Sequence, residues 1–375
     1  MTDSAFRFAD DLGPQKIVHI YEPGVDLKAI LVVDNVAAGP AIGGTRMAPD
    51  VSLEECVRLA RAMTLKNAAA GLPHGGGKSV IFADPSISAP EKERIMRAFA
   101  GAIGDITDYI PGPDMGTDEQ CMGWVKDEIG RAVGLPREIG GIPLDEIGAT
   151  GFGLAAAADV AKDYCGLDLK GARVAIQGFG AVGRHAARFL AGQGAVLVAA
   201  ADSAGTLSDP NGLNLEALVA LKRNGKRLTD AVGGEKRDRE AIVGIDCDIW
   251  IPAARPDVLH EENVDQVKAR IILEGANIPA TEAAERRLHE RGVLVVPDFI
   301  ANAGGVICAA VEFHGGSEAA AFEAIEEKIT RNTREVLEAM KTSGAQPREA
   351  AILLAEQRVR KAMSTRRWSS GNRPH

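Results

Sequence analysis

The sequence predicts an α/β protein of two domains, and three observations support this prediction. Its 375 residues exceed the size at which a single hydrophobic core usually stops growing. From Ala149 onward, short apolar runs alternate with helical patterns, an arrangement typical of βαβ units around a parallel sheet. The apolar fraction of 46% and the charged fraction of 25% are those of ordinary globular domains.

The first half of the chain has the less regular pattern. Apolar residues at helical spacing follow Ser52, which we expect to cap a helix, with Glu55 completing a capping box. Residues 130–148 are rich in glycine and proline and have no sustained period, which indicates a connection between domains. Strands are expected at Ala29–Val33 and Ser79–Phe82, and helices at Leu53–Ala69 and Pro90–Gly104.

The second half predicts a parallel sheet followed by long helices. The chain is expected to be helical from Gly316 to about Ser364. The stretch Thr206–Glu240 interrupts the series of strands and is expected to be a solvated loop and helix. The other expected elements are a helix at Phe152–Asp163 and strands at Arg173–Gln177, Ala195–Ala201, Cys247–Ile251, Arg270–Glu274 and Gly292–Val296.

Charge and cysteine usage exclude several classes of function. The net charge of −9 argues against a nucleic-acid partner, and a solvated terminus explains the basic stretch Arg358–Arg373. The five cysteines lie far apart without a C-x-x-C pair, so we expect packed thiols in a reducing compartment and no metal site. The longest apolar run, Ala195–Ala201, is too short to cross a membrane, and the acidic N-terminus lacks a signal segment. We therefore expect a cytoplasmic protein without a membrane partner.

A glycine-rich turn follows the first strand of the second half. Gly178, Gly180 and Gly183 fit the G-x-G-x-x-G pattern of dinucleotide-binding units, in which a helix N-terminus receives the pyrophosphate. The next strand ends at Asp202, whose carboxylate would accept hydrogen bonds from a ribose and repel a 2′-phosphate. We therefore predict a Rossmann-type domain that binds NAD. Ser203 and nearby basic residues leave NADP open, and a turn without any ligand is the alternative.

A second group of motifs lies in the first half. The sequence GGGKS (Gly75–Ser79) is not a P-loop, because Gly71 is one residue too early and a helix precedes the glycines. Three successive glycines let the backbone pass close to a ligand and leave Lys78 facing a pocket. If Lys66 lies nearby, two ammonium groups lower each other's proton affinity, so that one serves as a base and the other holds a carboxylate. Asp114 would transfer protons; solvated lysines and a turn aspartate are the alternative.

Seven motifs in a fixed order give the chain a resemblance to a known family. They are GPAIGGTRM, MTLKNAAAGL, PHGGGKSVI, GPDMGTDE, LKGARVAIQGFGAVG, EGAN and PDFIANAGGVI. Together they resemble the dehydrogenases that act on glutamate, leucine, phenylalanine and valine. The resemblance implies NAD-dependent, reversible deamination of an L-amino acid to a 2-oxo acid, NADH and ammonium by a homo-oligomer. It also implies a substrate and oligomerisation domain at 1–148, to which about 330–375 return, and a Rossmann domain at 149–329.

The resemblance further implies roles for individual residues. Lys78 matches the lysine that activates water, Lys66 the lysine that binds the α-carboxylate, and Asp114 the aspartate that exchanges a proton with the amino group. Asn302 resembles an asparagine beside the carboxylate and the nicotinamide. The other predicted substrate-binding residues are Ile42, Gly43, Gly112, Val306 and Ala309, and the predicted cofactor-binding residues are Gly178, Phe179, Gly180, Ala181, Val182, Gly183, Asp202, Ser203, Ala253, Asn277 and Thr150.

Two positions bear on the substrate side chain. Glutamate-specific relatives resemble this chain but have a lysine in place of Ile42 and a serine in place of Ala309, both of which suit a distal carboxylate. Because both residues are apolar here, we predict a branched-chain or larger hydrophobic amino acid, and Gly112 would enlarge the pocket. Two alternatives stay open: a glutamate dehydrogenase that uses Arg46 or Arg255, and a silent NAD-binding regulator.

Overall fold

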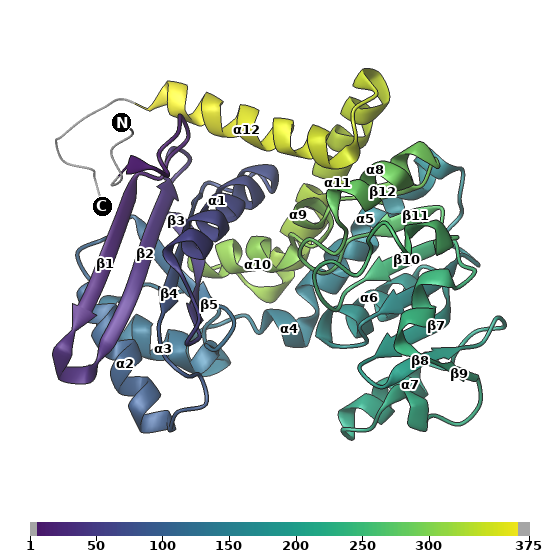
Figure 1. Cartoon of the computed structure of the whole chain (residues 1–375), viewed down its shortest axis with the longest axis horizontal. Coiled ribbons are helices and arrows are strands. Elements are labelled where there is room, and N and C mark those ends of the chain that lie inside the picture. Colours follow the sequence, from purple (N-terminus) through teal and green to yellow (C-terminus); the bar gives the residue numbers. More distant parts are fainter. Residues whose placement is uncertain (1–5, 367–375) are drawn as a thin grey trace. The chain divides into compact units, whose positions relative to one another are not determined.

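The computed structural model describes residues 6–366, which form two compact units (Figure 1). Unit 1 contains the chain up to Pro143, the short segment Glu312–Gly316 and the chain from Ile352 onward. Unit 2 contains the rest. Helix α11 (Glu318–Ser343) packs along α5 (Ala149–Cys165) within unit 2, and the chain rejoins unit 1 at Ile352.

Unit 1 is built around a five-stranded sheet in the order β1-β2-β4-β3-β5. Strands β3, β4 and β5 are parallel, whereas β2 runs antiparallel to both β4 and β1. One face packs against α1 through Ile30, Val80 and Ala60, and the other packs against α2 and α3 through a larger apolar core. The elements are β1 (Lys16–Glu22), β2 (Leu27–Asn35), β3 (Ala41–Met47), α1 (Leu53–Ala69), β4 (Gly75–Ile81), α2 (Ala89–Ala102), β5 (Tyr109–Pro113) and α3 (Glu119–Ile129).

The three glycines before Lys78 lie inside strand β4, not in a loop. A Cβ on Gly75 would lie 1.7 Å from the carbonyl oxygen of Asn35, and one on Gly76 would lie 2.0 Å from the backbone nitrogen of Thr64 in α1. The glycines therefore serve close packing of β4 against β2 and α1. This corrects the expectation that they let a ligand approach the backbone.

Unit 2 has a seven-stranded sheet in the order β12-β11-β10-β6-β7-β8-β9. The five strands from β12 to β7 are parallel, and the chain moves from one side of β6 to the other between β7 and β10, as in Rossmann-type folds. The elements not yet bounded are α4 (Leu144–Ile147), β6 (Arg173–Gln177), α6 (Ala181–Gly192), β7 (Val196–Asp202), β8 (Gly205–Ser208), α7 (Leu215–Arg223), β9 (Glu235–Arg237), β10 (Ile249–Pro252), β11 (Ile271–Leu273), α8 (Glu282–Glu290), β12 (Leu294–Val296), α9 (Asp298–Ala301), α10 (Gly304–Phe313) and α12 (Pro347–Thr365).

Two segments expected to be solvated are partly packed instead. Within Thr206–Glu240, β8 is buried and pairs antiparallel with β7, which extends the sheet. In the basic C-terminal stretch, Arg358 donates hydrogen bonds to the carbonyl oxygens of Ala68 (3.2 Å) and Ala69 (2.7 Å) at the end of α1. Residues 367–375 of that stretch lie outside the described residues.

All five cysteines are free thiols, and all except Cys165 are buried. Among residues 6–366, no helix is both long enough and apolar enough to cross a membrane.

Candidate functional site

The first group of predicted site residues surrounds Lys78 at the centre of the unit 1 sheet. The Nζ atom of Lys78 lies 2.6 Å from Oδ2 of Asp114, and the lysine side chain is only 7% exposed. Gly44, on the neighbouring strand, makes room for this pair, because a Cβ there would lie 3.0 Å from Nζ of Lys78 and 2.8 Å from Cβ of Asp114. The structure therefore places the two predicted catalytic residues in one buried, charge-assisted contact.

Arg46 extends this contact into a network of four charged groups. Its Nε donates to Oδ2 of Asp114 at 3.0 Å, and its other arm contacts the carboxylate of Glu55 at 2.5 Å. Ser52 caps α1 by accepting from the Glu55 N–H, but the Glu55 side chain pairs with Arg46, so the expected capping box is only half formed. Burial by itself would raise the pKa of Asp114, but Lys78 and Arg46 outweigh it and hold that pKa below its usual value.

The predicted substrate residues of β3 and β5 divide between the two faces of the sheet. Ile42 is buried and lies two residues before Gly44, so the two positions share the face that carries Lys78. Gly43 alternates to the other face, where a Cβ would lie 1.7 Å from the carbonyl oxygen of Gly77. At Gly112, a Cβ would lie 3.0 Å from Cγ2 of Val133, so this valine side chain borders the space expected there.

Lys66 occupies the last turn of α1 and is partly buried. The next residue, Asn67, fixes this helix end to the sheet by donating to the carbonyl oxygens of Gly75 (2.7 Å) and Ile42 (3.3 Å). The Oδ1 atom of Asn67 is buried without a hydrogen-bond donor among the described residues. Asn67 was not among the predicted site residues, although an amide directly before the apolar run AAAGL was the available signal.

The glycine turn of unit 2 fits a dinucleotide. Gly178 has φ +91°, and a Cβ there would lie 2.8 Å from the backbone of Ala253. A Cβ on Gly183 would lie 2.1 Å from the Gly178 carbonyl oxygen. Close packing therefore requires glycine at both Gly178 and Gly183. Gly180 has open space at its Cβ position, and it precedes the first turn of α6 without a side-chain cap. The backbone N–H groups in the first turn of α6, which no side chain caps, suit a pyrophosphate.

Other predicted site residues of unit 2, for the substrate and for the cofactor, lie at the same edge of its sheet. Asn302 is buried, and its amide donates to Oδ1 of Asn277 at 3.1 Å and to the carbonyl oxygen of Gly275 at 3.3 Å. A Cβ on Gly275 would lie 3.0 Å from Cβ of Ala253, so the turn after β10 is adjacent. Thr150 lies near the start of α10, because a Cβ on Gly305 would lie 3.3 Å from its hydroxyl.

The remaining predicted residues differ in exposure. Phe179 is buried, and its N–H donates to the carbonyl oxygen of Ala201 at 3.0 Å, so it supports the turn from within. Ala181 and Val182 form the first turn of α6, and Ser203 is exposed in the turn after β7. On α10, Val306 is partly buried and Ala309 is buried.

The Asp202 carboxylate, expected to accept hydrogen bonds from a ribose, already accepts hydrogen bonds from the protein. Its side chain is only 9% exposed, and Oδ2 accepts from Nζ of Lys222 (2.8 Å) and from the N–H of Leu228 (2.9 Å). Its Oδ1 accepts from the N–H of Ala204 at 2.9 Å. The carboxylate expected to meet a ribose is therefore bound by three donors of the protein itself.

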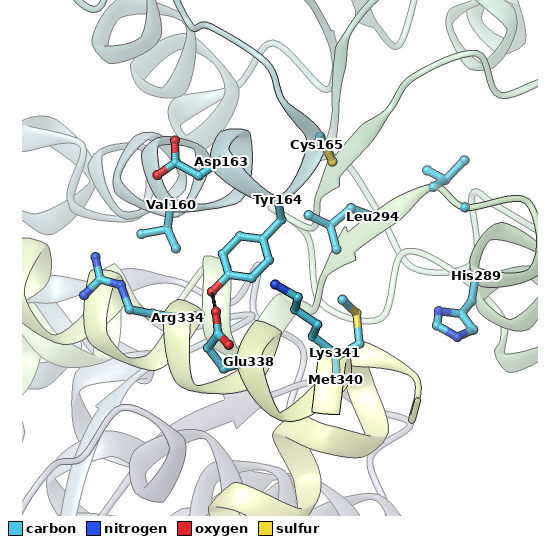
Figure 2. Close-up of a pocket in the computed structure, with 12 residues that line it drawn as sticks. Val160, Asp163, Tyr164, Cys165, His289, Leu294, Arg334, Glu338, Met340 and Lys341 are labelled. Carbon is cyan, nitrogen blue, oxygen red and sulfur yellow. Dashed lines mark hydrogen bonds between the residues drawn. The ribbon is translucent and has the colours of Figure 1, made fainter. Parts of the chain in front are cut away.

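A separate cavity of about 640 Å³ lies at the opposite, amino-terminal edge of the unit 2 sheet (Figure 2). It is bordered by the ends of α5 and α8 and by α11, and the Tyr164 hydroxyl donates to Oε1 of Glu338 there at 2.5 Å. None of the predicted site residues lines it.

The comparisons with known proteins decide the family. The Glu/Leu/Phe/Val dehydrogenase dimerisation domain matches residues 20–131, and the Glutamate/Leucine/Phenylalanine/Valine dehydrogenase model matches residues 140–367. The chain belongs to this dehydrogenase family. It is therefore an amino-acid dehydrogenase, an oxidoreductase that acts on CH–NH₂ donors with a nicotinamide cofactor. The resemblance noted in the sequence is confirmed, as is the two-domain α/β fold with a Rossmann-type sheet.

Individual members of the family agree with this assignment. The chain is 40% identical to a glutamate dehydrogenase of Aeropyrum pernix, over 89% of this chain and 85% of that protein. It is also 40% identical to an NADP(+)-dependent glutamate dehydrogenase of Pyrobaculum calidifontis, over 90% and 86%. Among solved structures, the Leu-bound hetero-hexameric glutamate dehydrogenase of Thermus thermophilus has a TM-score of 0.82 and 31% identity, covering 96% of this chain and 91% of that one. The L-tryptophan dehydrogenase of Nostoc punctiforme has a TM-score of 0.74 and 26% identity, covering 94% and 98%.

Proposed function

We propose that the chain oxidatively deaminates L-glutamate at the Lys78–Asp114 pair. The observation that carries the reaction is the 2.6 Å contact between Nζ of Lys78 and Oδ2 of Asp114 in a buried part of unit 1. The two atoms are close enough to pass a proton between them, which suits the removal of an amino proton and the activation of water. The overall change is amino acid, oxidised cofactor and water to 2-oxo acid, reduced cofactor, ammonium and a proton.

The remaining roles follow from the charges in unit 1. Lys66, in the last turn of α1, binds the substrate α-carboxylate, and Asn67 holds that helix end against β3 and β4. Asp114 exchanges a proton with the substrate amino group, and Lys78 activates the water that adds to the imino acid. When bound, the nicotinamide supplies the hydride acceptor. We propose NAD as the cofactor, as the acidic Asp202 indicates, and a homo-oligomer assembled through the dimerisation domain.

Glutamate is favoured as the substrate by the relatives, since those 40% identical to this chain are glutamate dehydrogenases. A second candidate is an apolar amino acid, and the observation that favours it is Ile42. This apolar residue is buried on the face that carries Lys78, where a distal carboxylate would need a cation. Arg46, an alternative partner for that carboxylate, already binds Asp114 and Glu55.

A substrate panel tests both candidates. NADH formation, followed by absorbance, gives kcat/KM for glutamate, leucine, valine and phenylalanine. We expect the value for glutamate to exceed the others at least about tenfold, or about 1.4 kcal/mol in transition-state free energy. The reverse order would establish the second candidate, and no turnover of any amino acid would refute the proposed reaction. If the apolar candidate is the correct one, Ile42→Lys should raise kcat/KM for glutamate and lower it for leucine.

A further inference from the structure

Glu312 is a buried glutamate near the end of α10 that is not among the predicted site residues. It lies in the short segment of the chain that belongs to unit 1. Its Oε1 atom accepts from the N–H groups of Gly134 (2.8 Å) and Leu135 (3.2 Å), and its Oε2 atom accepts from the N–H of Ile142 at 2.6 Å. One carboxylate therefore binds both ends of the segment 134–142, which lies 170 to 178 residues earlier in the chain.

The segment 134–142 depends on this carboxylate for its backbone hydrogen bonds. The stretch is rich in glycine and proline, forms no strand, and contains the short 3₁₀ helix Arg137–Ile139. The three N–H groups that Glu312 binds are buried, so they need acceptors from elsewhere in the protein. A carboxylate offers acceptors only, whereas a glutamine amide would place a donor against one of these N–H groups. The side chain of Glu312 thus supplies the order that the local sequence lacks.

The start of this segment borders the candidate substrate pocket. Val133 directly precedes Gly134, and its N–H donates to a carbonyl oxygen of β5 at 2.9 Å. A Cβ on Gly112 would lie 3.0 Å from Cγ2 of Val133. Gly134 has φ +70°, and a Cβ there would lie 2.5 Å from Cδ of Pro113 at the end of β5. The backbone that Glu312 holds therefore packs along β5, with Val133 against the space expected at Gly112.

We propose that Glu312 is a positioning residue that sets the selectivity of the site for the substrate side chain. Its carboxylate fixes the segment 134–142 and so keeps Val133 close to Gly112, where Val133 limits the size of the side chain that fits. Glu312 acts through the backbone of this segment and not through contact with the substrate. The inference rests on the proposed reaction of an amino acid at Lys78, and it adds a residue that governs which amino acids react.

The ratio of kcat/KM for leucine to kcat/KM for tryptophan tests the proposal. Both side chains are apolar and differ in bulk, and the ratio does not depend on the concentration of folded enzyme. In the purified full-length protein, Glu312→Gln should release Val133, admit the larger side chain, and lower the ratio at least about tenfold. Glu138→Gln, an exposed glutamate of the same segment, is the matched control and should leave the ratio unchanged. NADH binding should be the same in both variants, because the glycine turn belongs to unit 2.

Variation of Val133 separates positioning from a general effect on the fold. Val133→Ala removes the side chain that limits the pocket and should itself lower the leucine-to-tryptophan ratio. In the Val133→Ala background, Glu312→Gln should lower the ratio no further, because the two residues act in series. An unchanged ratio in Glu312→Gln would overturn the proposal, and so would an equal drop with and without the Val133 side chain. Glu312→Asp, whose carboxylate is one methylene shorter, should give a smaller drop and replaces Glu312→Gln if that variant does not fold.

Calorimetry gives a second readout that does not need turnover. Leucine and tryptophan are titrated into the protein in the presence of NADH, and the ratio of their dissociation constants should change in the same direction in Glu312→Gln. Absence of turnover with the expected change in binding would contradict the proposed reaction and leave the role of Glu312 in place. Turnover with no change in either ratio would contradict the role of Glu312 alone.

Discussion

The Lys78 ammonium and the Arg46 guanidinium both contact the same oxygen, Oδ2 of Asp114, at 2.6 Å and 3.0 Å. One carboxylate therefore links the predicted water-activating lysine to an arginine that is itself held by Glu55. Two cations and two carboxylates make this network neutral, which limits the cost of keeping it largely out of water. A substitution at Arg46 or Glu55 is therefore expected to affect the proposed reaction by changing the position or the pKa of the Asp114 carboxylate.

Replacement of Lys78 should separate catalysis from cofactor binding. Lys78→Ala removes the proton-transfer group, so turnover should fall by about 10²- to 10⁴-fold or more. NADH binding should stay nearly unchanged, because the glycine turn belongs to unit 2. Steady-state assays and NADH fluorescence titrations measure the two effects. Lys28→Ala, an exposed lysine of β2 in the same sheet, is the control, and substantial activity in Lys78→Ala would remove Lys78 from the mechanism.

Arg46 should control the pH dependence of the reaction as a positioning residue. Its positive charge helps to keep the pKa of Asp114 low, so the carboxylate is lost only as the pH falls through that low value. Arg46→Met raises the Asp114 pKa, and the acid limb of the kcat/KM profile should move to higher pH. Arg46→Lys retains a positive charge, so its acid limb should lie close to that of the unmodified protein. An unchanged limb in Arg46→Met would show that Arg46 serves only the packing of β3.

Gly180, which directly precedes α6, and Gly192, the last residue of α6, give a matched test of the cofactor site. Neither Gly180 nor Gly192 has another atom within 4 Å of its Cβ position. Gly180→Ala places a methyl group where the backbone is expected to meet the pyrophosphate, so NADH affinity should fall about tenfold, or about 1.4 kcal/mol. Gly192→Ala should leave NADH affinity unchanged and stabilise the helix by up to about 1 kcal/mol. Equal NADH affinity in the two variants would count against the predicted pyrophosphate position.

Arg348 should be essential for the stability of unit 2. It contacts three buried carboxylates, Glu274 (2.7 Å), Glu285 (2.6 Å) and Asp298 (2.9 Å). Burial raises the pKa of Glu274 despite the arginine, and removal of the arginine would raise it further. Arg348→Met should therefore cost about 3–5 kcal/mol at neutral pH, measured by urea denaturation.

The pH dependence of that loss provides an internal check on the Arg348 prediction. A carboxyl group whose pKa is raised by folding binds more protons in the folded state, so it stabilises the fold as the pH falls. The destabilisation of Arg348→Met should thus shrink from pH 8 to pH 5. Arg287→Met, an exposed arginine of α8, should cost less than about 1 kcal/mol at every pH. A loss independent of pH would show that the arginine acts through packing alone.

Local patterns predicted α1, α2 and the five parallel strands of unit 2, but they gave no expectation for β1, β3, β5 and α3 of unit 1. The bounds of α1 and β6 agree with the expected Leu53–Ala69 and Arg173–Gln177, because apolar spacing and flanking glycines mark both. Strand β8 was missed because its short run, GTLS, is polar in composition and is buried only by pairing with β7. The start of β4 was missed because three glycines read as a loop.

At the site, too, local motifs predicted some features, and contacts between distant residues account for others. Motifs indicated Lys78 and Asp114, and the structure brings these two side chains into contact. The proximity of Lys66 to Lys78 stays a prediction. The partners of Asp114 and Asp202 could not be read from the sequence, because Arg46 and Lys222 reach them only through strand register and through the fold of the segment after β8.

The packing of β4 limits the ways in which this active site can diversify during evolution. Side chains are excluded at Gly75 and Gly76 by backbone atoms of β2 and α1, which have no freedom to move aside. The strand that carries Lys78 is therefore closed to variation on its amino-terminal side. At Gly112, by contrast, a Cβ would lie closest to the tip of the Val133 side chain and not to the backbone of another element. If Lys78 is the reacting lysine, as proposed, new substrate preferences are expected to arise at positions such as Gly112 on β5 while Lys78 stays in place.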